Sequence, residues 1–157
     1  MRRQSLADAA ATAAAGEALG RVAAGGDVIA LVGELGAGKT SFTRGLAIGA
    51  GVDPDDVASP TFALVNEYAS RRVAVAHADL YRLERERELD EIGWDDLVER
   101  RDAVVVIEWA DRFPARLPAD HLRITLAYDG DARVLEATAT GPRSTALLAG
   151  WADAPKN

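Results

Sequence analysis

Hydrophobic residues form continuous runs in two parts of the chain and alternate with polar residues elsewhere. The runs at 27–32 and 103–107 are typical of strands buried on both faces of a sheet. Residues 122–128 alternate regularly, an Asp-Gly-Asp turn follows, and 133–140 can return beside them. This pattern predicts a β-hairpin after the second buried strand.

Other segments predict helices and further strands. The alanine-rich stretch 5–24 predicts a helix that Ser5 caps and whose first turn Asp8 stabilises. Residues 41–50 place hydrophobic side chains four apart, which predicts a second helix that glycines end. Two more strands, joined by a short turn, are predicted at 62–68 and 72–78.

The remaining segments are polar or charged. Residues 51–57 form a turn-rich connection, 82–99 are charged and mostly helical, and a short helix is predicted around 147–148. Buried strands that alternate with helices, together with hairpins, predict an α/β domain with a mixed parallel and antiparallel sheet. No repeat, linker or second domain is visible, so we expect residues 1–157 to form a single domain.

The charge balance and the absence of cysteine limit the functional classes. The chain has 25 acidic and 18 basic side chains, a net charge of −7 and two lysines, which disfavours direct nucleic-acid binding. Without cysteine there is no disulfide or thiolate metal site, as suits a reducing cytoplasm. Acidic residues interrupt the N-terminal alanine-rich stretch, and no run approaches the roughly 18 apolar residues of a membrane span. We expect a cytoplasmic protein without a membrane partner.

One motif indicates the ligand. Residues 33–40 match the phosphate-binding loop (Walker A) G-x-x-x-x-G-K-[ST], between a predicted strand and a predicted helix. The backbone N–H groups of such a loop bind phosphates, the lysine reaches the β- and γ-phosphates, and the threonine hydroxyl binds magnesium. The loop therefore predicts a nucleoside triphosphate with Mg²⁺ and a three-layer domain of the P-loop NTPase type. The phosphate-contacting residues are Gly33, Glu34, Leu35, Gly36, Ala37, Gly38, Lys39, Thr40 and the following Ser41.

A nucleotide site of this kind needs a carboxylate at the end of a neighbouring strand. Glu108 directly follows the buried run at 103–107 and is the best candidate, as a magnesium ligand or as a base toward water. The competing interpretation is an acid that caps the next turn. Asp79 is the second candidate, and its competing role is to cap the helical segment that follows. His77, two residues earlier, could orient Asp79 or simply be a core histidine.

Two further positions are candidates. Thr61 follows Ser59-Pro60, and a threonine in such a loop can sense the γ-phosphate, although the segment could equally be a plain loop. Trp109 follows Glu108, where an aromatic side chain is more often a packing residue than a base-stacking one.

Several separated motifs together resemble one family, over about residues 5–140. The TsaE family (formerly YjeE) is the ATPase component of bacterial tRNA threonylcarbamoyladenosine biosynthesis. The motifs that carry the resemblance are Gly33-Glu-Leu-Gly-Ala-Gly-Lys-Thr40, Ser59-Pro-Thr61 followed by Leu64-Val65, His77-Ala-Asp-Leu-Tyr-Arg82, Glu88-Leu-Asp-Glu-Ile-Gly93 and Glu108-Trp109.

The resemblance implies an ATPase with Mg²⁺ and assigns roles to residues. Lys39 would contact the phosphates, Thr40 would ligate magnesium, and Asp79 and Glu108 would form the acidic side of the site. Thr61 would lie in a switch-like loop, and Trp109 would support the site or a partner surface. Ala78 replaces the bulky residue common at this position in the family, which should alter packing more than chemistry, and Glu34 conservatively replaces the frequent aspartate. The motifs do not identify the residues that contact adenine, and the segments around Thr12 and Arg133 are only guesses.

The resemblance also implies partners. The protein would associate with the TsaB–TsaD heterodimer and meet tRNA only indirectly, through that complex. TsaD transfers the threonylcarbamoyl group to an adenosine beside the anticodon, and ATP hydrolysis would reset the complex between turnovers.

Two alternatives remain open. A small-molecule kinase would use the same loop and transfer the phosphate to a metabolite. An ATP-gated binding module would use ATP to control assembly, with incidental turnover. A GTPase is disfavoured, because the guanine-reading sequence N-K-x-D is absent.

Overall fold

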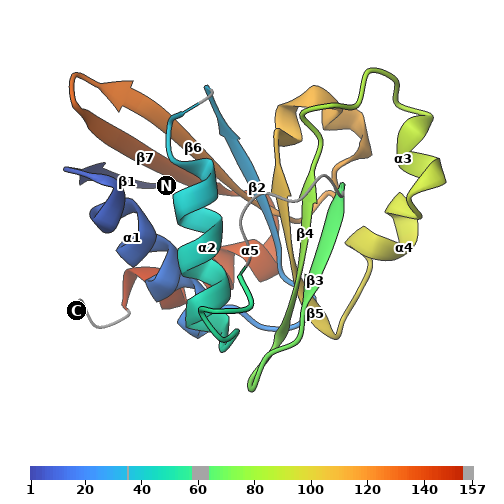
Figure 1. The fold of residues 1–157 in the computed structure, drawn as a ribbon, viewed down its shortest axis with the longest axis horizontal. Coiled ribbons are helices and arrows are strands. Elements are labelled where there is room, and N and C mark those ends of the chain that lie inside the picture. The colour runs from blue at the N-terminus through green and yellow to red at the C-terminus, as the bar shows by residue number, and fades with distance from the viewer. Residues whose placement is uncertain (35, 58–63, 154–157) are drawn as a thin grey trace.

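A single central sheet organises the chain (Figure 1). The structure is a computed structural model and describes residues 1–34, 36–57 and 64–153. These residues form a seven-stranded sheet in the order β1-β7-β6-β2-β5-β4-β3. The strands are β1 (Arg2–Leu6), β2 (Val28–Gly33), β3 (Val65–Tyr68), β4 (Ala74–Asp79), β5 (Ala103–Glu108), β6 (Leu122–Asp129) and β7 (Ala132–Ala139).

The centre of the sheet is parallel and its edges are antiparallel. Strand β2 pairs in parallel with β5 on one side and β6 on the other, and β4 extends the parallel part beside β5. Strands β3, β7 and β1 are the antiparallel additions. The predicted α/β fold with a mixed sheet is therefore confirmed, including the hairpin of β6 and β7.

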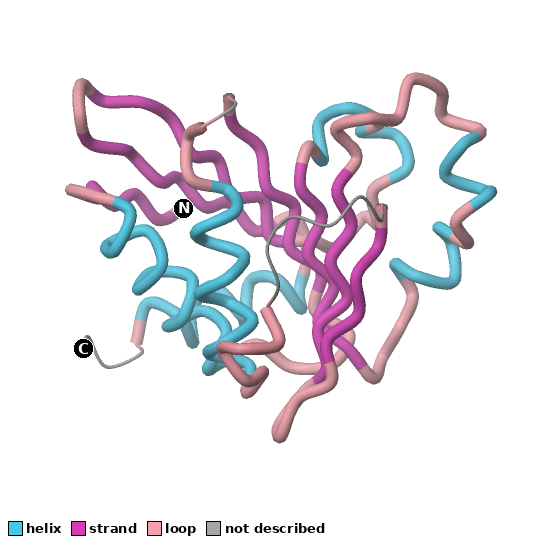
Figure 2. The backbone as a smooth tube through the Cα atoms, in the orientation of Figure 1, coloured by secondary structure: helices cyan, strands magenta, loops and turns pink. Residues whose placement is uncertain are grey.

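Helices cover both faces of the sheet, which gives three layers (Figures 1 and 2). Helices α1, α2 and α5 lie on one face, and α3, α4 and two 3₁₀ turns lie on the other. The helical elements are α1 (Ala9–Val22), α2 (Lys39–Ala50), α3 (Glu88–Glu91), α4 (Trp94–Val98), η1 (Ala110–Arg112), η2 (Pro114–Arg116) and α5 (Pro142–Ala152).

Each face of the sheet has its own hydrophobic core. On β2, Ile29 and Leu31 point to the side of α1, α2 and α5, whereas Val28 and Ala30 point to the side of α3 and α4. Successive side chains of a strand alternate between faces, so a strand covered on both sides needs an unbroken apolar run. This explains why β2 and β5 were readable as buried strands.

The N-terminal segment differs from the prediction. Residues 2–6 form strand β1, which pairs with β7, and the helix begins at Ala9 rather than near Ser5. Asp8 is the N-cap, and its carboxylate accepts a hydrogen bond of 2.8 Å from the Ala11 backbone N–H. The expected Ser5 cap is therefore wrong. The cause is tertiary, because the free edge of β7 provides the ladder that makes residues 2–6 a strand.

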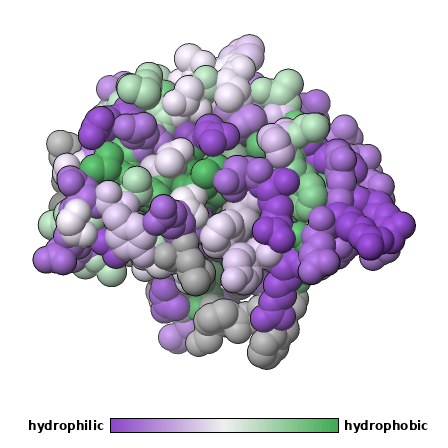
Figure 3. Space-filling model, turned by 90° about the horizontal axis from the view of Figure 1, so that it is seen from above, coloured by the Kyte–Doolittle hydropathy of each residue, from purple (hydrophilic) through white to green (hydrophobic). Residues whose placement is uncertain are grey.

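Two other segments are refined. The charged stretch 82–99 contains two short helices, α3 and α4, separated by Gly93 in the left-handed conformation with φ +70°. Figure 3 shows hydrophilic side chains concentrated on the side of the molecule where α3 lies. The C-terminal helix α5 is longer than the short helix predicted around 147–148. Among the described residues, no helix is long and apolar enough to cross a membrane.

Helices α1 and α2 approach each other unusually closely. A Cβ atom placed on Gly16 would lie 2.2 Å from the Phe42 carbonyl oxygen, and one on Gly45 would lie 2.0 Å from the Ala13 carbonyl oxygen. Only glycine permits such an approach between backbones. The helix that carries the phosphate-binding loop is thus fixed against α1.

Candidate functional site

The loop between β2 and α2 has the conformation that its glycines predict. Gly36 has φ +82° and Gly38, the N-cap of α2, has φ +109°, both in the region that side chains disfavour. Strand β2 ends at Gly33, where a Cβ would lie 2.5 Å from the Leu126 carbonyl oxygen. The curled loop thus points the N-terminal end of α2, with its unpaired backbone N–H groups, toward the space beyond the carboxyl end of β2.

Lys39 lies inside this curl and is only 5% exposed. Its ammonium group donates hydrogen bonds to the carbonyl oxygens of Gly33 and Glu34, the second at 2.9 Å. Burial lowers the pKa of Lys39, and the nearby carboxylates of Glu108, Asp111 and Asp79 partly raise it again. The lysine is therefore a buried cation held by loop carbonyls, available to an anion that enters the curl.

The two candidate acids are brought together by the parallel sheet. Asp79 ends β4 and Glu108 ends β5, and the two residues are direct partners in the β4–β5 ladder. Glu108 is also the partner of Leu31 on β2, so it lies next to the strand that enters the loop. Ligands of open α/β sheets bind at the carboxyl ends of parallel strands. The structure thus brings Asp79 and Glu108 to the same edge of the sheet as the loop.

The loop and the acids line one pocket of about 290 Å³. Its position at the carboxyl edge of the sheet corresponds to the upper part of the molecule in Figure 1. Eight of the thirteen predicted site residues line it, together with Tyr81; they are Gly36, Gly38, Lys39, Thr40, Ser41, Asp79, Glu108 and Trp109. The predicted residues Gly33, Glu34 and Ala37 do not line this pocket.

His77 contacts a different acid from the one expected. Its Nε2 hydrogen-bonds Oε2 of Glu108, across from β4 to β5, rather than orienting Asp79. Asp79 instead accepts a hydrogen bond of 3.1 Å from the Tyr81 backbone N–H. Asp79 therefore holds the turn that follows β4 and lines the pocket as well, whereas its competing interpretation proposed the cap of a helix, and the next helix begins only at Glu88.

Trp109 covers the lysine. Its ring centroid lies 4.1 Å from the Lys39 ammonium nitrogen, a cation–π contact, and 5.0 Å from the Tyr81 ring. Among the described residues it is the one non-glycine residue with positive φ, at 58°. Such a conformation costs free energy and is found mainly where surrounding contacts enforce it. Trp109 thus packs on the loop lysine and also against the core on the side of α3 and α4.

The opposite side of the loop is formed by α1 and the β6–β7 hairpin. A Cβ on Gly38 would lie 3.1 Å from the Thr12 methyl group, and Arg133 donates a hydrogen bond of 3.4 Å to the Gly36 carbonyl. The Arg133 guanidinium carbon lies 4.1 Å from the Tyr128 ring centroid. The two guessed segments, around Thr12 and Arg133, therefore both border the loop.

Sequence reasoning missed Tyr81, Tyr128 and Asp111 as neighbours of the loop. Tyr81 lies inside the motif of residues 77–82, which gives it no role of its own. Tyr128 carries only the signal of an alternating strand, and Asp111 lies in no motif. The predicted residues Leu35 and Thr61 lie outside the described residues.

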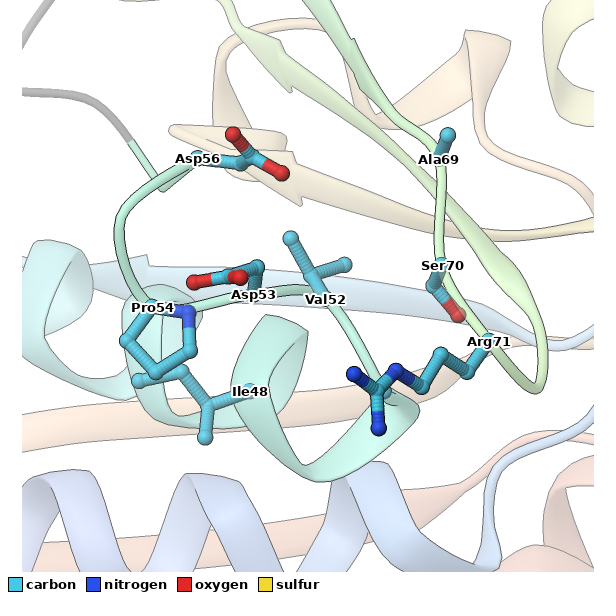
Figure 4. A pocket seen from close by; sticks show the side chains of 9 residues that line it. Ile48, Val52, Asp53, Pro54, Asp56, Ala69, Ser70 and Arg71 are labelled. Carbon is cyan, nitrogen blue, oxygen red and sulfur yellow. The ribbon is translucent and has the colours of Figure 1, made fainter.

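A second, larger pocket lies at the other end of α2. It measures about 580 Å³ and is lined by the connection after α2 and the turn between β3 and β4, including Asp53, Pro54 and Arg71 (Figure 4). None of the predicted phosphate- or magnesium-binding residues lines it. The two pockets therefore differ in the chemistry of their lining, and the smaller one carries the predicted phosphate- and magnesium-binding residues.

The fold and the loop together define the class of protein. A parallel sheet core, a phosphate-binding loop after β2 and acids at the ends of β4 and β5 are the features of a P-loop NTPase-type α/β domain. Sequence comparison then gives the family. Residues 6–135 match the family described as threonylcarbamoyl adenosine biosynthesis protein TsaE, and the chain belongs to the TsaE family.

Individual relatives agree with this assignment. A tRNA threonylcarbamoyladenosine biosynthesis protein TsaE from Nostoc sp. is 39% identical over 142 residues, covering 88% of this chain and 86% of the relative. The protein of the same name from Bacillus subtilis is 40% identical over 119 residues, covering 75% and 73%. The crystal structure of Bacillus subtilis YdiB superposes with a TM-score of 0.77 at 29% identity, covering 96% of this chain and 93% of that one. The family resemblance seen in the motifs is confirmed.

Proposed function

We propose that this chain binds ATP with Mg²⁺ and hydrolyses it, as the ATPase of tRNA threonylcarbamoyladenosine modification. The observation that carries the proposal is one pocket that brings together Lys39, Thr40, Asp79 and Glu108. A buried cation and the N-terminus of a helix bind phosphate, while a hydroxyl and two carboxylates suit a hard cation. The relatives named for this modification supply its biological setting.

The donor set fits magnesium. Mg²⁺ prefers oxygen ligands and takes only one or two carboxylates from the protein, with phosphates and water completing the octahedron. Thr40, Asp79 and Glu108 offer such oxygens, and among the described residues there is no group of three or more histidine, cysteine or acidic side chains that could hold a metal alone. When bound, Mg²⁺ would be held by these oxygens and would neutralise negative charge on the phosphates.

The orientation of the nucleotide follows from the two sides of the loop. The acids lie on the side of β5 and β4, so the γ-phosphate belongs there. The nucleoside then leaves toward α1 and the β6–β7 hairpin, where Thr12, Tyr128 and Arg133 border the loop. In this orientation Lys39 would hold the β- and γ-phosphates, and Glu108 or Asp79 would orient the attacking water.

The proposed partners are the TsaB–TsaD heterodimer and, only through it, tRNA. The net charge of −7 and the two lysines argue against direct tRNA binding, which depends on clustered basic side chains. The role of hydrolysis would be to reset the complex between turnovers.

Phosphate release, measured with the chain alone and then with the heterodimer and tRNA, tests the proposal. We expect slow Mg²⁺-dependent ATP hydrolysis that the complete mixture accelerates, and no hydrolysis by Glu108→Ala, which should still bind ATP through the loop. Transfer of the phosphate to a metabolite would instead establish a kinase. Unchanged turnover in the complete mixture, with ATP-dependent association, would favour an ATP-gated binding module.

A further inference from the structure

We infer that His77 is a positioning residue, which holds the Glu108 carboxylate in the orientation that ATP hydrolysis requires. The inference rests on the proposed function and adds to it a residue that does not line the nucleotide pocket itself. It begins from the hydrogen bond between His77 Nε2 and Glu108 Oε2, which joins β4 to β5 beneath the loop.

The backbone register brings the two side chains together. In the parallel ladder Asp79 is the partner of Glu108, and His77 is the partner of Val106, two residues earlier on each strand. Because side chains two apart on a strand point to the same face, His77, Asp79 and Glu108 all lie on the face that carries α1 and α2. His77 thus reaches Glu108 diagonally, from one strand to the next.

Glu108 depends on this partner. Its side chain is only 5% exposed, and burial of an unpaired carboxylate is costly. Among the described residues, the His77 ring supplies the hydrogen bond to the Glu108 carboxylate, while the neighbouring Lys39 acts at longer range. The terminal torsion of a glutamate side chain is soft, so without a hydrogen bond the plane of its carboxylate is not fixed. His77 therefore fixes one oxygen and leaves the other for the pocket.

Asp79 does not need the same support. Its carboxylate is already held by the Tyr81 backbone N–H at 3.1 Å, within its own turn. The two acids of the site are thus oriented by different means, one by local backbone and one by a side chain from the neighbouring strand. Removal of His77 should affect Glu108 selectively.

Steady-state ATP hydrolysis in the complete mixture, with three variants, tests this role. We expect His77→Ala to lower kcat by about 10- to 100-fold, the usual cost of losing a partner that orients a ligand side chain, and to leave the KM for ATP within about threefold of wild type. His77→Gln, whose amide can donate from a similar position, should recover most of the lost kcat. His121→Gln is the matched control, since the other histidine of the chain contacts the Pro118 carbonyl near the start of β6. It should leave both parameters unchanged.

A second readout needs neither nucleotide nor metal. With only two histidines, ¹⁵N-histidine-labelled protein gives two imidazole spin systems. Glu108→Gln should shift the His77 resonances and leave those of His121 in place, and this comparison holds even if His77→Ala does not fold. Unshifted His77 resonances would refute the contact, and a larger KM with unchanged kcat in His77→Ala and His77→Gln would refute the positioning role. Failure of the wild type to hydrolyse ATP would instead refute the proposed function, which the labelled-histidine comparison does not test.

Discussion

The glycines between α1 and α2 allow a sharp test of how the loop helix is held. In Gly45→Ala, the new Cβ would lie 2.0 Å from the Ala13 carbonyl oxygen and 2.9 Å from its carbon, whereas ordinary contacts begin at 3.4 Å. The obstacle is backbone, which no rotamer change can remove. Two helices would have to separate locally by about 1.4 Å, in a core packed as densely as a crystal.

The magnitude follows from two opposed effects. Replacing glycine by alanine inside a helix contributes about 0.5–1 kcal/mol of stability when space is available. Overpacking a core costs about 1–3 kcal/mol, and a clash with helix backbone belongs at the upper end. We expect Gly45→Ala to lower the free energy of unfolding by about 2 kcal/mol net, which corresponds to a loss of roughly 4–8 °C in Tm at this chain length.

Gly150→Ala is the matched control. Gly150 also lies inside a helix, α5, but a Cβ there would meet only the Val22 side chain at 4.0 Å. This variant should therefore gain roughly 0.5–1 kcal/mol from helix propensity alone. Thermal and urea unfolding followed by circular dichroism measure both. A Gly45→Ala protein as stable as Gly150→Ala would show that the close approach of α1 and α2 is wrong.

Three further predictions concern the pocket. Because burial lowers the pKa of Lys39, the unfolded chain binds the lysine proton more tightly than the folded one. The free energy of unfolding of the wild type, relative to that of Lys39→Met, should therefore rise as the pH increases toward 10.5. If urea unfolding shows that this difference does not change with pH, the burial of Lys39 is contradicted. Lys39→Met should also weaken ATP binding at least tenfold in calorimetric titration, because the loop loses its cation, and unchanged affinity would exclude Lys39 from the phosphate site. Tryptophan emission should change on ATP binding through Trp109, which contacts Lys39, and not through the buried Trp94 and Trp151; a response that persists in Trp109→Phe would refute this assignment.

Local chemistry made much of the site predictable. The loop motif needs specific residues at fixed spacing, and the continuous apolar runs of β2 and β5 mark strands covered on both faces. Once both strands are parallel and adjacent, Glu108 must lie beside the loop. Its position therefore followed from the motif and the buried run, given that β5 lies next to β2.

Contacts between distant segments were not predictable in the same way. The strand at 2–6 exists because β7 offers a free edge, and nothing within those residues distinguishes that outcome from the start of a helix. The partner of His77 depended on which neighbouring strand its side chain faces, which requires the sheet order β2-β5-β4. The proximity of Tyr81 and Tyr128 to the loop depended on where the turn after β4 and the β6–β7 hairpin lie relative to it.

The misassigned N-terminus has a functional consequence, because it changes how α1 is anchored. A helix beginning at Ser5 would be held only by its packing on α2, whereas the observed α1 follows a strand fixed to the sheet through β7. Thr12, on the first turns of α1, lies against Gly38, and Gly16 packs on the Phe42 carbonyl one turn further along α2. The sheet edge, α1 and the loop helix thus form a continuous support for the phosphate-binding loop. The loop conformation is therefore maintained by long-range packing as well as by its own glycines.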